Sequence, residues 1–233
     1  MKHLILVSAV LFSINGWVNE NKITEVQIKM SDGISLAADI YWPAGADKKD
    51  RYPILLEYLP YRKDESRARN YSLYSYFLEH DYLVVRVDMR GTGNSEGITI
   101  PYEYSDIELD DGEEVINWLS QQEWSTGSVG MFGISWGGFN SIQMAMRNPP
   151  ALKAFVSLMA TEYLYQEDVH YMDGIMHTDS WMMGNDLYNV LPGAPDFKMD
   201  EEWVKNRFNV KPSVYTYMRQ QRDGAFWDRA SAK

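Results

Sequence analysis

The sequence predicts an α/β fold with a mostly parallel, doubly wound sheet, and three observations carry this prediction. Short apolar segments alternate with helical segments from residue 52 to residue 159, at the spacing of βαβ units. The apolar segments are nearly continuous, as expected for strands that helices cover on both faces. With 233 residues, 45% hydrophobic and 24% charged, the chain has a globular composition and can bury a large core.

A hairpin precedes the parallel part of the predicted sheet. Residues 25–30 alternate polar and apolar side chains with a period of two, and residues 34–42 alternate again. Between these runs, Ser31-Asp32-Gly33 is a turn sequence. Two alternating runs joined by a short turn predict a pair of antiparallel strands.

The alternating strands and helices then follow in order. Runs rich in β-branched and other apolar residues predict the strands, and longer amphipathic runs predict the helices. The strands are expected at residues 53–58, 82–88, 128–134 and 153–159, and the helices at residues 70–79, 106–121 and 136–147. Ser105 or Asp106 begins the second helix, whose first turns carry acids where the helix dipole favours them.

The sequence changes character after residue 160. Residues 161–233 mix aromatic, methionine and acidic side chains without a strand pattern. We therefore predict two regions, an α/β core over residues 24–160 and a helical cap inserted over residues 161–233. No strand that would finish the sheet is expected in the second region.

The N-terminus has the pattern of a signal peptide. Met1-Lys2-His3 is a basic start, residues 4–14 are apolar, and Asn15-Gly16 follows. The apolar run is shorter than the roughly 20 residues that a membrane-spanning helix needs. We expect residues 1–16 to be a signal peptide, the protein to be periplasmic or secreted, and the mature form to have no membrane partner.

Charge and composition exclude several classes of function. Asp and Glu number 33 against 22 Lys and Arg, a net charge of −11, which repels a nucleic-acid backbone. Because the chain has no cysteine, any nucleophile in it must be Ser, Thr, Lys or a carboxylate. In Gly91-Thr-Gly93-Asn-Ser-Glu-Gly97 the last glycine falls one place late for a dinucleotide-binding loop, so no cofactor is expected.

One serine has the context of an activated nucleophile. Gly133-Ile-Ser135-Trp-Gly137 matches G-x-S-x-G, the pattern of a strained turn between a strand and a helix. An apolar strand precedes Ser135 and a helical run follows it. Gly93-Asn-Ser95-Glu-Gly97 also matches, but Ser95 lies in a glycine-rich loop and Pro101 bars a helix soon after it. Ser95 is better explained as a residue that orders this loop.

Two groups of metal-ligand residue types are present, and neither predicts a metal site. Residues 106–114 hold six acids, but the glycine spacing does not fit a calcium loop, so a solvated helix face is favoured. His170 and His177 are seven residues apart and would share a helix face. Asp168 and Asp173 are nearby and zinc accepts such ligands, but no pattern of supporting residues is evident around them, so no metal is expected.

Several segments together resemble one known family, the CocE/NonD hydrolases, which include cocaine esterase and X-Pro dipeptidyl-peptidase-like serine hydrolases. The resemblance covers roughly residues 24 to 233. The segments that carry it are Tyr52-Pro-Ile-Leu-Leu, Pro60-Tyr61-Arg-Lys, Asp88-Met-Arg-Gly-Thr-Gly-Asn-Ser-Glu-Gly97, Trp124-Ser-Thr-Gly-Ser-Val-Gly-Met-Phe-Gly-Ile-Ser135-Trp-Gly-Gly and Asp168-Val-His-Tyr-Met172. It implies an α/β-hydrolase fold with a helical cap insertion, and cleavage of carboxylic esters or amides through an acyl-serine. It also implies a C-terminal jelly-roll domain that these residues do not include.

The resemblance assigns the site residues one by one. Ser135 matches the nucleophile, Trp136 would donate its backbone N–H to the oxyanion, and Tyr61 matches the tyrosine whose hydroxyl is the second donor. The position of Tyr61 just past a predicted strand agrees with a site at the carboxyl edge of the sheet. Aromatic and acidic residues of the cap are further candidates for a substrate pocket, namely Tyr163, Tyr165, Asp168, Tyr171 and Trp181.

The acid and base of a catalytic triad are not evident in these residues. In this fold the triad order is Ser, then Asp or Glu, then His, but the only histidines after Ser135 are His170 and His177 in the cap. The resemblance implies that both groups lie beyond the cap and that the 233 residues alone hydrolyse little. Three alternatives remain open: an esterase or amidase of small molecules, a dipeptidyl-peptidase of short peptides, or an inactive binding module. The oligomeric state is also left open.

Overall fold

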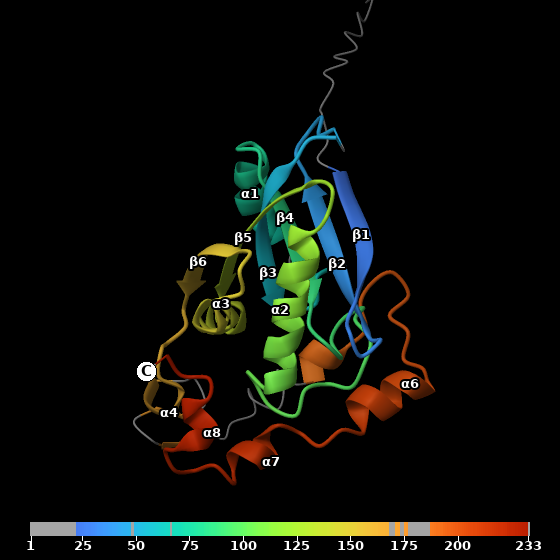
Figure 1. The fold of residues 1–233 in the computed structure, drawn as a ribbon. Helices are drawn as coiled ribbons and strands as arrows, with labels where there is room; N and C mark the ends of the chain where they lie inside the picture. Colours follow the sequence, from blue (N-terminus) through green and yellow to red (C-terminus); the bar gives the residue numbers. More distant parts are fainter. Residues whose placement is uncertain are drawn as a thin grey trace, which may run out of the picture.

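The fold is a six-stranded mixed sheet with helices on both faces and a smaller, mainly helical region at one end (Figure 1). The computed structural model describes residues 22–47, 49–65, 67–167, 171–172, 175–176 and 187–232. The predicted signal peptide, residues 1–16, lies outside this part. None of the helices in this part is long and apolar enough to cross a lipid bilayer.

The sheet has the strand order β1-β2-β4-β3-β5-β6. The predicted hairpin is present: β1 and β2 pair antiparallel, and Gly33 takes a φ of 93° in the turn between them. Strand β2 is also antiparallel to β4, whereas β3, β4, β5 and β6 are mutually parallel. The strands are β1 (Lys22–Lys29), β2 (Ser35–Trp42), β3 (Tyr52–Leu59), β4 (Leu83–Asp88), β5 (Ser125–Ile134) and β6 (Leu152–Leu158).

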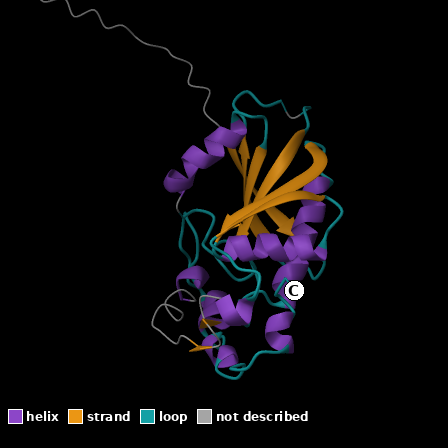
Figure 2. Cartoon of the chain, turned by 90° about the vertical axis from the view of Figure 1, so that its left-hand side faces the viewer, coloured by secondary structure: helices purple, strands orange, loops and turns teal. Residues whose placement is uncertain are grey.

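Helices cover both faces of this sheet, which explains its continuous apolar strands (Figure 2). On one face α1 (Arg67–Leu78) packs through Tyr74 and Leu78. The opposite face, with the larger core, is covered by α2 (Asp106–Ser120) and α3 (Trp136–Arg147). Each predicted helix and strand of the core is therefore present, with ends that differ by a few residues.

The region after residue 160, which the sequence analysis predicts to be a cap and which is called the cap below, differs in one respect from the sequence prediction. Two strands that the sequence did not indicate, β7 (Tyr171–Met172) and β8 (Ile175–Met176), pair with each other in a separate sheet. They are only two residues long, too short to show a period of two. The other elements are α4 (Leu164–Glu167), α6 (Glu201–Trp203), the π-helical segment η1 (Val204–Phe208), α7 (Val214–Tyr217) and α8 (Ala225–Asp228).

Strand β6 is an edge of the sheet within the described residues, and it carries exposed apolar side chains. Phe155, Val156 and Leu158 are each about half exposed, and the adjoining Met159 is 86% exposed. An edge strand with unpaired backbone groups and an apolar surface is suited to pairing with a further strand. By comparison, every residue of the central strand β4 is buried.

Candidate active site

Ser135 lies on a strained turn between β5 and α3. Its φ of 57° and ψ of −123° are unfavourable for a residue with a side chain, and α3 begins at the next residue. The turn is held on both sides, because the Ser135 N–H donates to the Leu158 carbonyl and the Phe139 N–H donates to the Ser135 carbonyl, each at 2.9 Å. This is the strand–turn–helix geometry that the G-x-S-x-G pattern predicts, and it leaves Ser135 half-buried at the carboxyl edge of the sheet.

The first glycine of the motif is required by close backbone contact. A Cβ atom on Gly133 would lie 2.4–2.7 Å from the backbone of Gly137. The second glycine is less restricted, since a Cβ on Gly137 would meet Leu59 at 3.7 Å, an ordinary contact distance.

This difference predicts unequal effects of two alanine substitutions within one motif. Gly133→Ala should lower the free energy of unfolding by about 1–3 kcal/mol or more, because backbone must shift to admit the methyl group. Gly137→Ala should change it by less than about 1 kcal/mol, since alanine also favours the helix. Urea denaturation of both variants measures this, and equal losses would contradict the steric explanation.

Tyr61 brings its hydroxyl group to the same turn from the loop after β3. The Tyr61 O–H donates to Ser135 Oγ at 3.2 Å, and the backbone N–H of Trp136 donates to Tyr61 Oη at 3.3 Å. Burial raises the pKa of Tyr61, although its contacts with Ser135 and Trp136 act in the opposite direction. The phenol therefore stays protonated at neutral pH. A backbone N–H and a phenolic O–H thus converge beside the Ser135 hydroxyl.

The sequence analysis did not predict that Glu108, an acid in contact with Trp136, is buried. Glu108 of α2 is completely buried and accepts a hydrogen bond from Trp136 Nε1 at 2.6 Å and another from the Tyr104 N–H at 2.6 Å. Asp111, also buried, binds Arg90 through both oxygens. The interpretation of residues 106–114 as a solvated face is therefore wrong for these two acids. The available signal was that Glu108 continues the apolar stripe of Gly112, Val115, Ile116 and Leu119.

Burial raises the pKa of Glu108 to about 8, despite hydrogen bonds that favour its charged form. The folded protein therefore keeps this proton between pH 4.5, the ordinary pKa, and about pH 8, whereas the unfolded chain releases it. The unfolded chain binds fewer protons in this interval, so the free energy of unfolding falls as pH rises.

Glu108→Gln should remove this contribution, because an amide does not titrate. We expect the stability of the unaltered protein to fall more steeply than that of the variant between about pH 5 and 8. Urea denaturation of both proteins across this interval measures the two slopes. Parallel slopes would show that Glu108 is ionised in the folded protein.

The rival serine has the structural role that its sequence context indicated. Ser95 is buried, donates to the Asp88 carbonyl at 2.6 Å and accepts from the Ala37 N–H at 2.8 Å. Both hydrogen bonds join the loop after β4 to the neighbouring strands. Ser95 thus orders this loop and has no strand–turn–helix setting.

An apolar cavity of about 200 Å³ lies beside Trp136, between the sheet edge and the cap. The loops after β3 and β4 form one side and residues 187–213 of the cap form the other. Charged side chains at its wall come from Glu103, Arg207 and Lys211. Apolar residues that line it include Pro60, Ile100, Tyr102, Val190, Phe208 and Val210.

Three of the predicted pocket residues pack within the cap. Tyr171 is completely buried against Trp227, with ring centroids 4.5 Å apart, and Tyr165 stacks on Tyr171 at 5.4 Å. Tyr163 hydrogen-bonds to Asp223. None of these three tyrosines lines the cavity beside Trp136. Their part in a substrate pocket stays a prediction.

The remaining predicted residues lie outside the described part of the chain: Asp168 and Trp181 of the pocket, and His170 and His177. The histidine that the structure does describe is His80, exposed after α1, with Nδ1 2.7 Å from the Tyr76 carbonyl. Within the described residues no histidine hydrogen-bonds to Ser135.

One group of acids in the described part is close enough to hold a metal ion: Glu25, Asp39 and Asp64. The ammonium group of Lys63 already lies among them, 2.9 Å from Asp39, 3.1 Å from Asp64 and 3.6 Å from Glu25. Burial disfavours the charged form of Lys63, but the hydrogen bonds and charges of Asp39 and Asp64 together raise the pKa of Lys63. These acids therefore neutralise a buried lysine.

Comparison with known proteins identifies the family. Residues 32–233 match the family model described as X-Pro dipeptidyl-peptidase (S15 family). The chain belongs to this family. Cocaine esterase from Rhodococcus sp. (strain MB1 Bresler) is 34% identical over 150 residues, which cover 64% of this chain and 25% of the esterase. The chain thus spans about a quarter of the length of this relative.

Solved structures agree on the fold. A CocE/NonD family hydrolase from Staphylococcus aureus superposes with a TM-score of 0.70 at 24% identity, over 89% of this chain and 38% of that one. An α-amino acid ester hydrolase superposes with a TM-score of 0.66 at 23% identity, over 97% of this chain and 43% of that one. The prediction of an α/β-hydrolase fold and the resemblance to CocE/NonD hydrolases are therefore confirmed.

Proposed function

We propose that this protein is a serine hydrolase that cleaves carboxylic ester or amide bonds through an acyl-serine on Ser135. The observation that carries the proposal is the convergence of the Tyr61 hydroxyl and the Trp136 N–H within 3.3 Å of each other beside Ser135 Oγ. Two fixed donors next to a serine on a strained turn fit the developing oxyanion of acyl transfer.

In the proposed reaction, Ser135 Oγ attacks the acyl carbon while a general base takes its proton. The carbonyl oxygen gains negative charge and accepts hydrogen bonds from Tyr61 and Trp136. Collapse of this intermediate expels the alcohol or amine, which takes the proton, and leaves the acyl-serine. A water molecule then repeats the attack, releases the acid and restores the Ser135 hydroxyl.

The general base and its acid partner are proposed to come from outside the described residues. Within the described part, no histidine hydrogen-bonds to Ser135. The open apolar edge of β6 is next to the turn that carries Ser135, since Leu158 accepts its N–H. A further strand paired there would end close to the nucleophile, where a triad acid or base is needed.

The cavity beside Trp136 is the proposed binding site for the apolar part of a substrate. Its volume of about 200 Å³ and its largely apolar lining fit a small aromatic or branched aliphatic group. We expect small esters with such groups to be better substrates than acetyl esters. The proposed partner is therefore a small ester, an amide or a short peptide.

A panel of substrates tests the proposal. The protein expressed from its complete reading frame would be assayed with p-nitrophenyl acetate, p-nitrophenyl benzoate and Gly-Pro-p-nitroanilide. Turnover of the esters alone favours an esterase, and turnover of the anilide favours a dipeptidyl-peptidase. A folded protein that cleaves none of them and does not react with a fluorophosphonate would instead be an inactive binding module.

A further inference from the structure

Asp88, the last residue of β4, links two loops of the site from a buried position. Its side chain is completely buried, and its two oxygens accept hydrogen bonds from different backbone N–H groups. One oxygen accepts from Lys63 and the other from Asn94 at 2.9 Å. Lys63 is two residues after Tyr61, so Asp88 holds the loop that carries the tyrosine.

The backbone between Tyr61 and Lys63 needs such support. Arg62 has a φ of 60°, in the left-handed region that is unfavourable for a residue with a side chain. Its guanidinium lies 4.2 Å from the Tyr188 ring of the cap, which helps to fix this conformation. With Arg62 in this conformation, the residues on either side of it reach different partners. The Tyr61 hydroxyl contacts Ser135, and the Lys63 N–H contacts Asp88.

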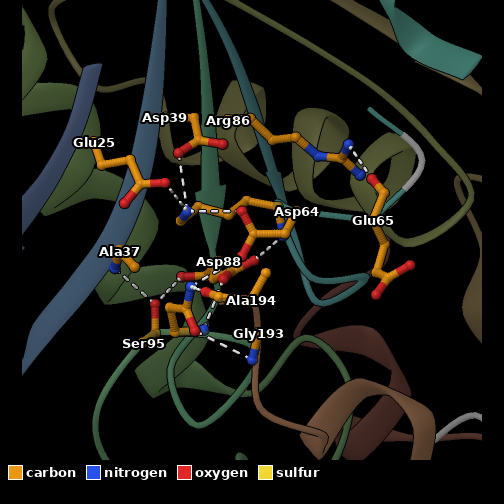
Figure 3. A network of polar contacts seen from close by, with 12 residues as sticks. Glu25, Ala37, Asp39, Asp64, Glu65, Arg86, Asp88, Ser95, Gly193 and Ala194 are labelled. Atoms are coloured by element: carbon orange, nitrogen blue, oxygen red, sulfur yellow. Dashed lines mark hydrogen bonds and ion pairs between the residues drawn. The ribbon is translucent and has the colours of Figure 1, made fainter. Parts of the chain in front are cut away.

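Asn94 extends the network from Asp88 to the cap residues Gly193 and Ala194. Figure 3 shows Asp88, Gly193 and Ala194 close together in this network. Its side-chain amide donates to Asp64 and to the Ala194 carbonyl, both at 2.9 Å, and its side-chain oxygen accepts from the Gly193 N–H at 3.1 Å. The cap segment, the loop after β3 and the loop after β4 therefore meet at one side chain.

The packing around this network leaves no room for larger residues. A Cβ atom on Gly93 would lie 2.2 Å from an oxygen of Asp88, and one on Gly193 would lie 2.5 Å from Asn94 Oδ1. Burial raises the pKa of Asp88 to about 7, while the N–H groups of Asn94 and Lys63 and the charge of Lys63 favour its ionised form. The two backbone N–H donors and the charge of Lys63 thus offset part of the cost of burying the Asp88 carboxyl group.

We propose that Asp88 is a positioning residue that holds the Tyr61 hydroxyl at Ser135, and that Asn94 couples this position to the cap. The proposal rests on the proposed function, because it requires Tyr61 to stabilise the oxyanion. Asp88 touches neither the substrate nor the reacting atoms; it acts through the Lys63 backbone and the strained Arg62.

A double-mutant cycle between Asp88 and Tyr61 tests this, in the protein expressed from its complete reading frame. Asp88→Asn places an amide donor opposite an N–H donor, and we expect kcat to fall about 10- to 100-fold with KM within about 3-fold. In a Tyr61→Phe background the same change should cost less than about 3-fold, because the hydroxyl it positions is already absent. A role in stability alone would reduce kcat by the same factor in both backgrounds.

Asp111→Asn is the matched control, since Asp111 is another buried carboxylate but binds Arg90 rather than the Tyr61 loop. Its effect on kcat should be the same with and without Tyr61→Phe. If Asp88→Asn does not fold, Asn94→Ala replaces it, with the same expected coupling to Tyr61→Phe. The inference would be overturned if the Asp88 or Asn94 variant lowered kcat by the same factor with and without Tyr61→Phe. Loss of activity in Ser135→Ala alongside such independence would leave the proposed function intact.

Discussion

Replacing Ser135 with alanine should lower kcat for ester hydrolysis by about 10⁴- to 10⁶-fold, the loss expected when a hydrolase loses its nucleophile. The variant removes one oxygen from a half-buried position, so the fold should be retained. Initial rates with p-nitrophenyl benzoate, measured on the protein from its complete reading frame, give the effect. Circular dichroism of the variant confirms that the loss is chemical.

Ser95→Ala is the informative comparison for this substitution. Ser95 matches the same short motif but hydrogen-bonds to the backbone of Asp88 and Ala37, so its removal should chiefly lower stability. If Ser95→Ala lost covalent labelling by a fluorophosphonate while Ser135→Ala kept it, the nucleophile would have to be reassigned.

Tyr61→Phe should lower kcat by about 10²- to 10³-fold, the typical cost of removing one oxyanion donor. In the proposed mechanism the hydroxyl acts on the transition state, so KM should change little. The phenylalanine ring keeps the packing of Tyr61, and the strained turn at Ser135 is held by other hydrogen bonds. Steady-state kinetics on the same ester measures both constants.

Tyr76→Phe serves as the control, since Tyr76 is an exposed residue of α1. Its kcat should equal that of the unaltered protein. A Tyr61→Phe variant with unchanged kcat would mean that the oxyanion is stabilised by other donors, and the site would need a different assignment.

The sequence was sufficient for the parts of the fold that local patterns specify. A strand, a turn with glycines on both sides of Ser135 and a helix follow one another, so the strand–turn–helix setting could be predicted from the sequence. The hairpin could be predicted from its period of two, and β4 from its run of β-branched residues. Sheet order could not, because the pairing of β2 with β4 joins strands more than 40 residues apart, and no local pattern encodes it.

The supporting acids of the site were beyond local patterns for a related reason. Glu108 and Asp88 can be buried because Trp136 and Lys63 bring hydrogen-bond donors to them from distant segments. An acid in a sequence is normally assigned to the surface, since burial without partners is costly. The position of Glu108 on the apolar stripe of its helix was the one local indication.

The cap was the least predictable region. From the sequence, its aromatic residues fit a substrate pocket and a hydrophobic core equally well, because both need apolar side chains at similar spacing. The structure packs Tyr165 and Tyr171 against Trp227, while Phe208, Val210 and other residues line the cavity beside Trp136. Which tyrosine faces which side depends on short helices that lack a long amphipathic pattern.

The identity of the nucleophile can be tested directly by finding which residue a fluorophosphonate modifies. The protein from its complete reading frame would be treated with the probe, digested, and mapped by mass spectrometry. We expect one stoichiometric adduct on Ser135, absent from Ser135→Ala and formed much more slowly in Tyr61→Phe. An adduct on any other residue, or a folded protein that resists the probe, would contradict it.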